Sequence, residues 1–172
     1  FVQCAGSRDV NHLNYCSGVC CLASLKQATY VKEQNPDAEV TMYYIDRRAP
    51  GRNEDVLLKV AAMEGVKLTK GKVGRIEQNG GGLKLHVEDV ESETILEAEH
   101  DMVVLATGMV PNAVDEDLAV FTRKDDDGFV LDDDDSNVTV AGVARRPEDV
   151  AASVRDATGA AARALVAAGR RS

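Results

Sequence analysis

The chain has 172 residues, of which 44% are hydrophobic and 28% are charged, and its formal net charge at pH 7 is −9. This length suits one domain or a small pair, and the acidic balance argues against nucleic acid as a partner, because that would require a basic face. No apolar run approaches the roughly 20 residues that cross a bilayer, and nothing resembles a signal peptide, so we expect a cytoplasmic protein with no membrane span of its own.

The start of the chain predicts a folding unit that begins without a lead-in. The first residue is Phe rather than Met, and the apolar segment 1–5 is suited to a buried strand. We therefore expect a fragment of a longer protein, cut close to the beginning of a folding unit. Turn residues 6–9 follow, and Asn14 or Ser17 is expected to cap a helix that ends near Gln34.

Strands and helices then alternate. Segment 39–46 (EVTMYYID) is rich in β-branched and aromatic residues and predicts a second strand. Asn53 is expected to cap a second helix, and segment 66–69 predicts a short third strand. The core-facing side of that second helix is predicted to consist of Val56, Leu57, Val60 and Ala61. Such alternation predicts a parallel sheet with right-handed crossovers.

After this α/β run, the spacing of apolar residues changes from the helical pattern to strict alternation. Segments 72–77, 83–89 and 94–98 alternate apolar and polar residues between turn sequences, as antiparallel strands with one solvated face do. Segment 102–106 (MVVLA) is apolar throughout, which predicts a parallel strand buried on both faces.

The remainder of the chain predicts a short strand at 138–140 and a long final helix. Pro147 suits the first turn of that helix, where Glu148 and Asp149 favour the positive end of the helix dipole. The apolar stripe of the helix comprises Val150, Val154, Ala157, Ala161 and Leu165. The aspartate runs at 125–127 and 132–135 lack the spacing of a calcium loop and predict solvated turns.

All four cysteines lie near the start of the chain. Cys4, Cys16, Cys20 and Cys21 form the pattern C-x11-C-x3-C-C, which indicates a site because cysteines that only fill a core would scatter. Vicinal cysteines without an export signal argue against disulfides, and C-x3-C-C differs from the paired knuckles of structural zinc. An iron-sulfur cluster is the third interpretation, since a strand end and a helix start can together supply thiolates.

A nicotinamide site is a further alternative for the same segment. A strand, a turn, a helix and a second strand that ends in Asp46 match the layout of a dinucleotide fold, but the G-x-G-x-x-G fingerprint is absent. Arg47 and Arg48 are better interpreted as a solvated loop. His12 is expected to be an exposed loop histidine, and no nucleophile has an identifiable base, so hydrolytic chemistry is not indicated.

Four segments carry a resemblance to a known family. FVQCAGSRD, YCSGVCCLASLKQA, MVVLATGMVPN and VAGVARRPEDVAASV resemble the A subunit of heterodisulfide reductase. They resemble still more closely its relative in sulfate reducers, the A subunit of the quinone-interacting membrane-bound oxidoreductase associated with adenylylsulfate reductase. The resemblance covers nearly the whole chain, and the cysteine pattern is its most specific part.

The resemblance implies an α/β fold of the FAD- and NAD-linked reductase type. Residues 1–111 would form a Rossmann-like, three-layer nicotinamide-type domain with an antiparallel meander, and residues 112–172 would be the C-terminal segment of a flavin-binding domain. A [4Fe-4S] cluster would be held by Cys4, Cys16, Cys20 and Cys21. The FAD contacts would fall on Thr107, Gly108, Pro111, Asn112, Gly142, Val143, Pro147, Glu148, Asp149 and Val150. The commoner family pattern has Asp where this chain has Val143, so the usual contact of an acid with the ribityl chain is missing.

The implied function is that of an oxidoreductase subunit without bond-making catalytic residues, which moves electrons between FAD and the cluster in sulfate respiration. Its partners would be other subunits of a membrane-bound complex and, indirectly, adenylylsulfate reductase. We expect the fragment alone to be inactive, to bind FAD weakly or not at all, and to self-associate through an apolar face. The alternatives are an NAD(P)H-dependent reductase that uses Cys20 or Cys21 as a redox thiol, and a zinc-binding scaffold.

Overall fold

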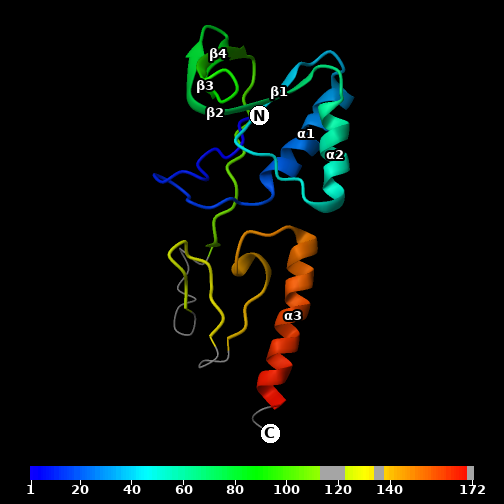
Figure 1. Cartoon of the computed structure of the whole chain (residues 1–172), viewed down its shortest axis with the longest axis vertical. Coiled ribbons are helices and arrows are strands. Elements are labelled where there is room, and N and C mark those ends of the chain that lie inside the picture. The colour runs from blue at the N-terminus through cyan, green and yellow to red at the C-terminus, as the bar shows by residue number, and fades with distance from the viewer. Residues whose placement is uncertain (113–122, 134–137, 170–172) are drawn as a thin grey trace. The chain divides into compact units, whose positions relative to one another are not determined.

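The computed structural model describes residues 1–112, 123–133 and 138–169 (Figure 1). These residues cluster into two compact units, each described by itself below. The first unit consists of Phe1–Asn14 and Cys20–Gly108, and the second of Tyr15–Val19 and Met109–Ser172. In the described ranges, no helix is long and apolar enough to cross a membrane.

The first unit is an α/β structure built on a four-stranded mixed sheet with the strand order β1-β2-β3-β4. The predicted α/β, Rossmann-like class is therefore confirmed. In chain order its elements are α1 (Cys20–Gln34), β1 (Val40–Tyr44), the 3-10 turn η1 (Gly51–Asn53), α2 (Glu54–Ala61), β2 (Val66–Asn79), β3 (Gly82–Asp89) and β4 (Thr94–His100). The helices α1 and α2 lie side by side (Figure 1).

Strand β1 is buried between two layers. Its Val40 and Met42 pack against Leu25 of α1 and Val60 of α2 in one core cluster. Its Tyr43 points to the other face, where the second cluster includes Leu85 and Val87 of the meander. Because successive side chains of a strand alternate between faces, one five-residue strand joins both cores.

Two extended segments continue the parallel sheet beside β1. Val2 bridges both Tyr43 of β1 and Leu105, and the backbones of Gln3 and Tyr43 bond across that edge. Segments 1–5 and 102–106 thus take the predicted places but form isolated bridges rather than strands. The prediction that segment 102–106 is buried on both faces is wrong, since Met102 is 77% and Leu105 is 51% exposed.

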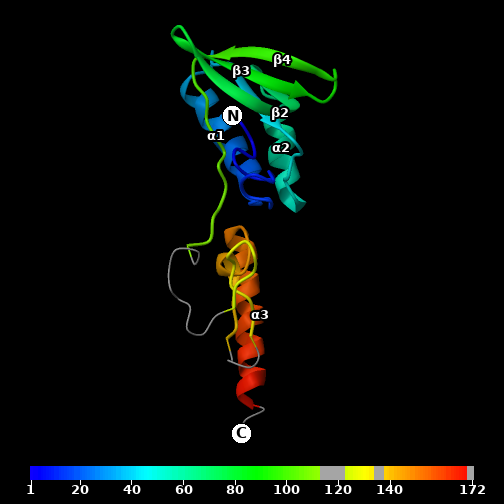
Figure 2. The same cartoon turned by 90° about the vertical axis from the view of Figure 1, so that its left-hand side faces the viewer.

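Strand β2 is longer than the sequence predicted. Segments 66–69 and 72–77 were expected to be two strands, whereas β2 runs unbroken from Val66 to Asn79. It pairs with β1 in parallel as far as Lys70 and with β3 in antiparallel from Gly71 onward. Figure 2 shows β2, β3 and β4 side by side. A Cβ on Gly71 would lie 2.6 Å from the Glu88 carbonyl oxygen, so glycine permits this close pairing.

Helix α2 buries less of its predicted face than expected. Val60 is fully buried and Leu57 packs on the same cluster, but Val56 is 39% exposed and Ala61 is also exposed. Asn53 makes no capping hydrogen bond through its side chain, contrary to prediction. The helix has eight residues, of which Val60 is the buried one.

The second unit is built around α3 (Val150–Gly169) and the 3-10 turn η3 (Gly142–Ala144). The helix packs through small and polar residues, of which Ala160 is the buried one, while its predicted apolar stripe points outward. Val150 is 82%, Val154 is 63% and Leu165 is 74% exposed. The predicted strand at 138–140 is reduced to a bridge between Asp133 and Val138, and Asp134 and Asp135 lie outside the described residues.

Candidate functional site

Cys4 lies in a backbone turn that ordinary side chains avoid. Its φ is +56°, and Gly6 and Arg8 follow with φ of +75° and +55°. For residues other than glycine, such left-handed conformations are uncommon and persist only where the surroundings fix them, often at functional sites. The turn after segment 1–5 therefore holds Cys4 in a specific, strained conformation.

The first residues of the loop that follows are held by two contacts with distant parts of the chain. The Ser7 hydroxyl is buried and donates to the Thr107 carbonyl at 3.4 Å. Lys72, at the start of the meander, forms an ion pair with Asp9 at 2.9 Å. His12 is exposed, as the sequence predicted. The hydrogen bond to Thr107 identifies that predicted flavin residue as a neighbour of the cysteine loop.

Cys20 and Cys21 are the first two residues of α1. The Cys21 thiol donates to the carbonyl of Asp46 at 3.7 Å, and the Asp46 carboxylate pairs with Arg8 at 2.9 Å. Amides at a helix N-terminus stabilise thiolate charge, which makes this position suitable for metal-ligating cysteines. α1 begins at Cys20, after both Asn14 and Ser17, so the predicted capping of the helix by either residue is wrong.

Cys16 belongs to the second unit, within the segment Tyr15–Val19. The Tyr15 hydroxyl donates to the Met109 carbonyl at 2.9 Å, and the Ser17 hydroxyl accepts the Met109 amide at 2.8 Å. The Tyr15 ring also meets the Phe129 ring edge-on, with 5.2 Å between centroids. The residues on both sides of Cys16 are thus attached to Met109.

A cavity of about 360 Å³ lies in the second unit. It is lined by Met109, Val110, Pro111, Asn112, Phe129, Val130, Val143 and Ala144. Pro111, Asn112 and Val143 are residues predicted to contact FAD, and the structure brings these three together. The volume and the mostly apolar lining match small-molecule sites, which usually measure about 300 to 1,000 Å³.

Other predicted flavin residues have structural roles in this unit. The Asp149 carboxylate accepts the Ala152 amide and so caps α3, and Glu148 pairs with Arg146. Gly142 has φ +64° and donates its amide to Asp156 at 2.9 Å. None of these residues, nor Pro147 or Val150, lines the cavity described above. Thr107 and Gly108 belong to the first unit.

Within residues 1–112, 123–133 and 138–169, no three histidine, cysteine, aspartate or glutamate side chains form a group that could hold a metal ion. The four cysteines are of the ligand type that an iron-sulfur cluster requires, and each is partly exposed rather than sealed in an apolar core. Gln3, beside Cys4, is 5% exposed, and neither of its amide atoms has a hydrogen-bond partner among the described residues. Orphaned amides of this kind are expected where a bound group or water completes the bonding.

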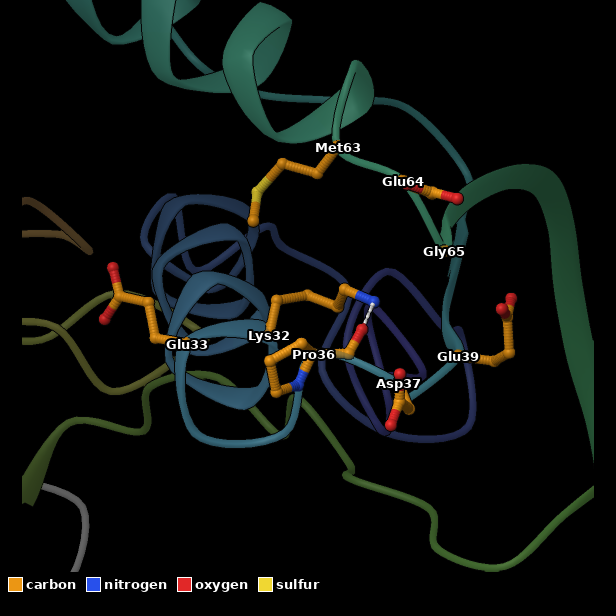
Figure 3. Close-up of a pocket in the computed structure, with 8 residues that line it drawn as sticks. All are labelled: Lys32, Glu33, Pro36, Asp37, Glu39, Met63, Glu64 and Gly65. Carbon is orange, nitrogen blue, oxygen red and sulfur yellow. Dashed lines mark hydrogen bonds between the residues drawn. The ribbon is translucent and has the colours of Figure 1, made fainter.

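A second cavity, of about 600 Å³, lies where β1 and β2 begin (Figure 3). Lys32 in its wall already donates to the carbonyls of Pro36 and Ala38. Ligands of open α/β sheets bind beyond the carboxyl ends of the strands, and Glu39 and Gly65 place this cavity at the opposite ends. The cysteines, not this cavity, therefore mark the candidate site of the first unit.

Sequence reasoning missed several residues of the site. Tyr15 and Ser17 flank Cys16, so their adjacency to a candidate ligand was an available signal. Phe129, an apolar residue between two aspartate turns, was another. Arg8 and Asp156 had no such signal, because their partners are distant in sequence.

Comparison with known proteins relates the chain to redox enzymes. No protein-family model matches it. The A subunit of the H(2):CoB-CoM heterodisulfide,ferredoxin reductase from Methanothermobacter thermautotrophicus is 37% identical over 180 residues, which cover 96% of this chain and 27% of that protein. The homologues of this chain are heterodisulfide reductase A subunits.

Two further relatives are also named as heterodisulfide reductase A subunits or as similar to them. An iron-sulfur A subunit of the CoB-CoM heterodisulfide reductase from Methanopyrus kandleri is 32% identical over 97% of this chain and 28% of its own length. A protein of Archaeoglobus profundus, named as similar to the heterodisulfide reductase A subunit, is 34% identical over 96% of this chain and 25% of its own length. The chain thus spans about a quarter of the length of these relatives. The predicted resemblance to heterodisulfide reductase A subunits is confirmed.

Proposed function

We propose that this chain is part of an electron-transfer oxidoreductase that couples a flavin to a [4Fe-4S] cluster. The observation that carries the proposal is the attachment of the Cys16 segment to Met109 and Phe129, which line the cavity of the second unit. The segment that carries one candidate cluster ligand thus contacts two residues that line a candidate flavin cavity. The A subunits among the homologues support the same chemistry, since two of them are named as iron-sulfur subunits.

In this proposal Cys4, Cys16, Cys20 and Cys21 hold the cluster, which supplies one-electron transfer when bound. The strained turn fixes the backbone of Cys4, and the start of α1 favours the thiolates of Cys20 and Cys21. The side-chain amide of Gln3, which has no hydrogen-bond partner in the described part of the chain, lies next in sequence to the first of these ligands. No other residue of the chain is assigned a bond-making role.

FAD is proposed to contact Pro111, Asn112 and Val143 in the cavity, and its remaining contacts are proposed from the sequence resemblance. Val143 is 50% exposed and offers no carboxylate, so the ribityl chain gains no charge-assisted hydrogen bond there. We accordingly propose that the isolated chain binds FAD weakly or not at all and is inactive by itself.

The physiological setting is proposed from the sequence resemblance. Electrons would pass between a membrane quinone pool and adenylylsulfate reductase in sulfate respiration, through other subunits of a membrane-associated complex. The homologues are named as subunits of CoB-CoM heterodisulfide reductases, which supports the presence of partner subunits. Adenylylsulfate reductase as a partner rests on the sequence resemblance alone.

Anaerobic reconstitution with ferrous iron and sulfide tests this function. We expect the wild-type chain to bind about four iron and four sulfide ions with brown absorbance, as a [4Fe-4S] cluster requires. Cys16→Ser should lose this cluster, whereas the matched control Val10→Ser, at an exposed position in the same loop, should keep it. About one zinc per chain without sulfide would instead identify a zinc scaffold. Reduction of a bound chromophore by NADPH would identify the nicotinamide-dependent alternative.

A further inference from the structure

The segment that carries Cys16 is held from both sides. Tyr15 precedes Cys16 and Ser17 follows it, and their hydroxyls engage the carbonyl and the amide of Met109. Both backbone polar groups of one cavity-lining residue are therefore bonded to the immediate neighbours of the cysteine. A pair of hydrogen bonds of this kind fixes orientation as well as position.

Tyr15 combines a polar and an apolar contact. Its hydroxyl donates to Met109, while its ring meets Phe129 at an interplanar angle of 72°. Burial, followed by the negative charges of Asp127 and Asp125, raises the pKa of Tyr15 above its ordinary value. The hydroxyl contact and the ring contact together fix the orientation of the Tyr15 side chain.

Ser17 is more deeply placed than Tyr15. It is 1% exposed, and its oxygen accepts the Met109 amide at 2.8 Å. Removal of that oxygen would leave a partly buried amide without this acceptor, which costs more than the net value of the bond itself. Ser17 therefore has a structural reason to be a hydroxyl residue rather than alanine.

Gly18 directs a hydrogen bond at the cysteine itself. Its amide donates to the Cys16 sulfur at 3.4 Å, and its φ of +71° is a conformation that glycine adopts without strain. Hydrogen bonds from backbone amides to ligating sulfur stabilise negative charge and are one of the factors that set cluster potentials.

We propose that Tyr15 and Ser17 are positioning residues that hold the Cys16 sulfur, with its Gly18 hydrogen bond, beside the wall of the cavity. The inference rests on the proposed function, because it assigns these residues to the coupling between a cluster ligand and a flavin cavity. All of the hydrogen bonds are made within the protein chain, so they position Cys16 without help from a cofactor. This lowers the cost of ordering the ligand when the cluster binds.

The test compares Tyr15→Phe and Ser17→Ala with the exposed controls Tyr30→Phe and Ser92→Ala. In the cluster-free chain, alkylation of each cysteine by iodoacetamide is followed by tandem mass spectrometry, which assigns the modified cysteine within the peptide 9–26. Loss of one hydrogen bond should raise the rate at Cys16 about fivefold in either variant, with the rates at Cys20 and Cys21 unchanged. The controls should match the wild type.

A second readout uses the reconstituted chain. A redox titration should show a shifted cluster potential in Tyr15→Phe and Ser17→Ala with the iron content unchanged. Unchanged Cys16 alkylation in both variants would overturn the positioning role, as would equal acceleration at all cysteines, which indicates general loosening. If Ser17→Ala does not fold, Tyr15→Phe decides alone, since it retains the ring contact. Because alkylation needs no cluster, failure of reconstitution counts only against the proposed function.

Discussion

Gly142 shows how a single backbone conformation shapes the second unit. It has φ +64°, and a Cβ at this position would lie 3.2 Å from the Cβ of Ser153 in α3. We expect Gly142→Ala to lower the free energy of unfolding by about 1 to 2 kcal/mol, because a left-handed conformation costs other residues that much. Urea denaturation followed by circular dichroism measures the change.

Gly81→Ala is the matched control, since a Cβ there meets no atom within 4 Å. It should leave the unfolding midpoint close to that of the wild type. Equal stability of the two variants would show that the turn at Gly142 relaxes without cost, and the close packing of η3 on α3 would then have to be reconsidered.

The carboxylate of Asp156, which bonds the same turn, is expected to make the free energy of unfolding depend on pH. The hydrogen bond from the Gly142 amide, and then the charge of Arg145, hold the pKa of Asp156 below its ordinary value of 3.8. The folded-state pKa is the lower one, so the contribution of this carboxylate to stability is complete above about pH 4 and is lost as the pH falls through the folded-state pKa.

Asp156→Asn should therefore be less stable than the wild type at pH 7, and the difference should shrink as the pH falls below the ordinary pKa of an aspartate. Unfolding midpoints in urea, taken from pH 7 down to below the ordinary pKa of an aspartate, measure this difference in stability. Asp37→Asn, at an exposed position in the first unit, is the control. A difference that stays constant with pH would exclude the ionised carboxylate as its cause.

Among the elements, α2 has one buried residue, Val60. Val60 is fully buried against the α1 and β1 core, whereas Val56 on the same helix is 39% exposed. We expect Val60→Ala to cost about 2 kcal/mol in unfolding free energy, since it opens a cavity in a packed core. Val56→Ala should change stability by less than about 0.5 kcal/mol. Thermal or urea unfolding of both variants checks this, and equal effects would contradict the burial pattern.

Element by element, the sequence predicted α1, β1 and α2 in the first unit. The helical spacing of apolar residues in α1 and the β-branched and aromatic run of β1 were sufficient, because each of these signals lies within the element itself. The two strands predicted in β2 could not be recognised as one, since the change from parallel to antiparallel partners at Gly71 has no local signal. The exposure of Met102 likewise depends on what covers that edge, not on its own apolar run.

For the whole molecule, the outward apolar stripe of α3 predicts self-association. Val150, Val154 and Leu165 lie at helical spacing and are each more than half exposed. Surfaces of this kind in water favour burial against a second copy. Sedimentation analysis should show concentration-dependent association of the chain, and Val154→Glu with Leu165→Glu should abolish it. A monomer at high concentration would contradict this, and Val56→Glu, on α2, serves as the control.

The sequence by itself determined the α/β class, the resemblance to heterodisulfide reductase A subunits and the four candidate ligands, because these depend on residue type, spacing and local periodicity. Only the tertiary structure decided which residues accompany those ligands. The strained turn at Cys4, the Arg8 pair with Asp46 and the attachment of the Cys16 segment to Met109 and Phe129 were settled at this level. The contacts among them join residues far apart in the chain, and no local pattern encodes how packed elements meet.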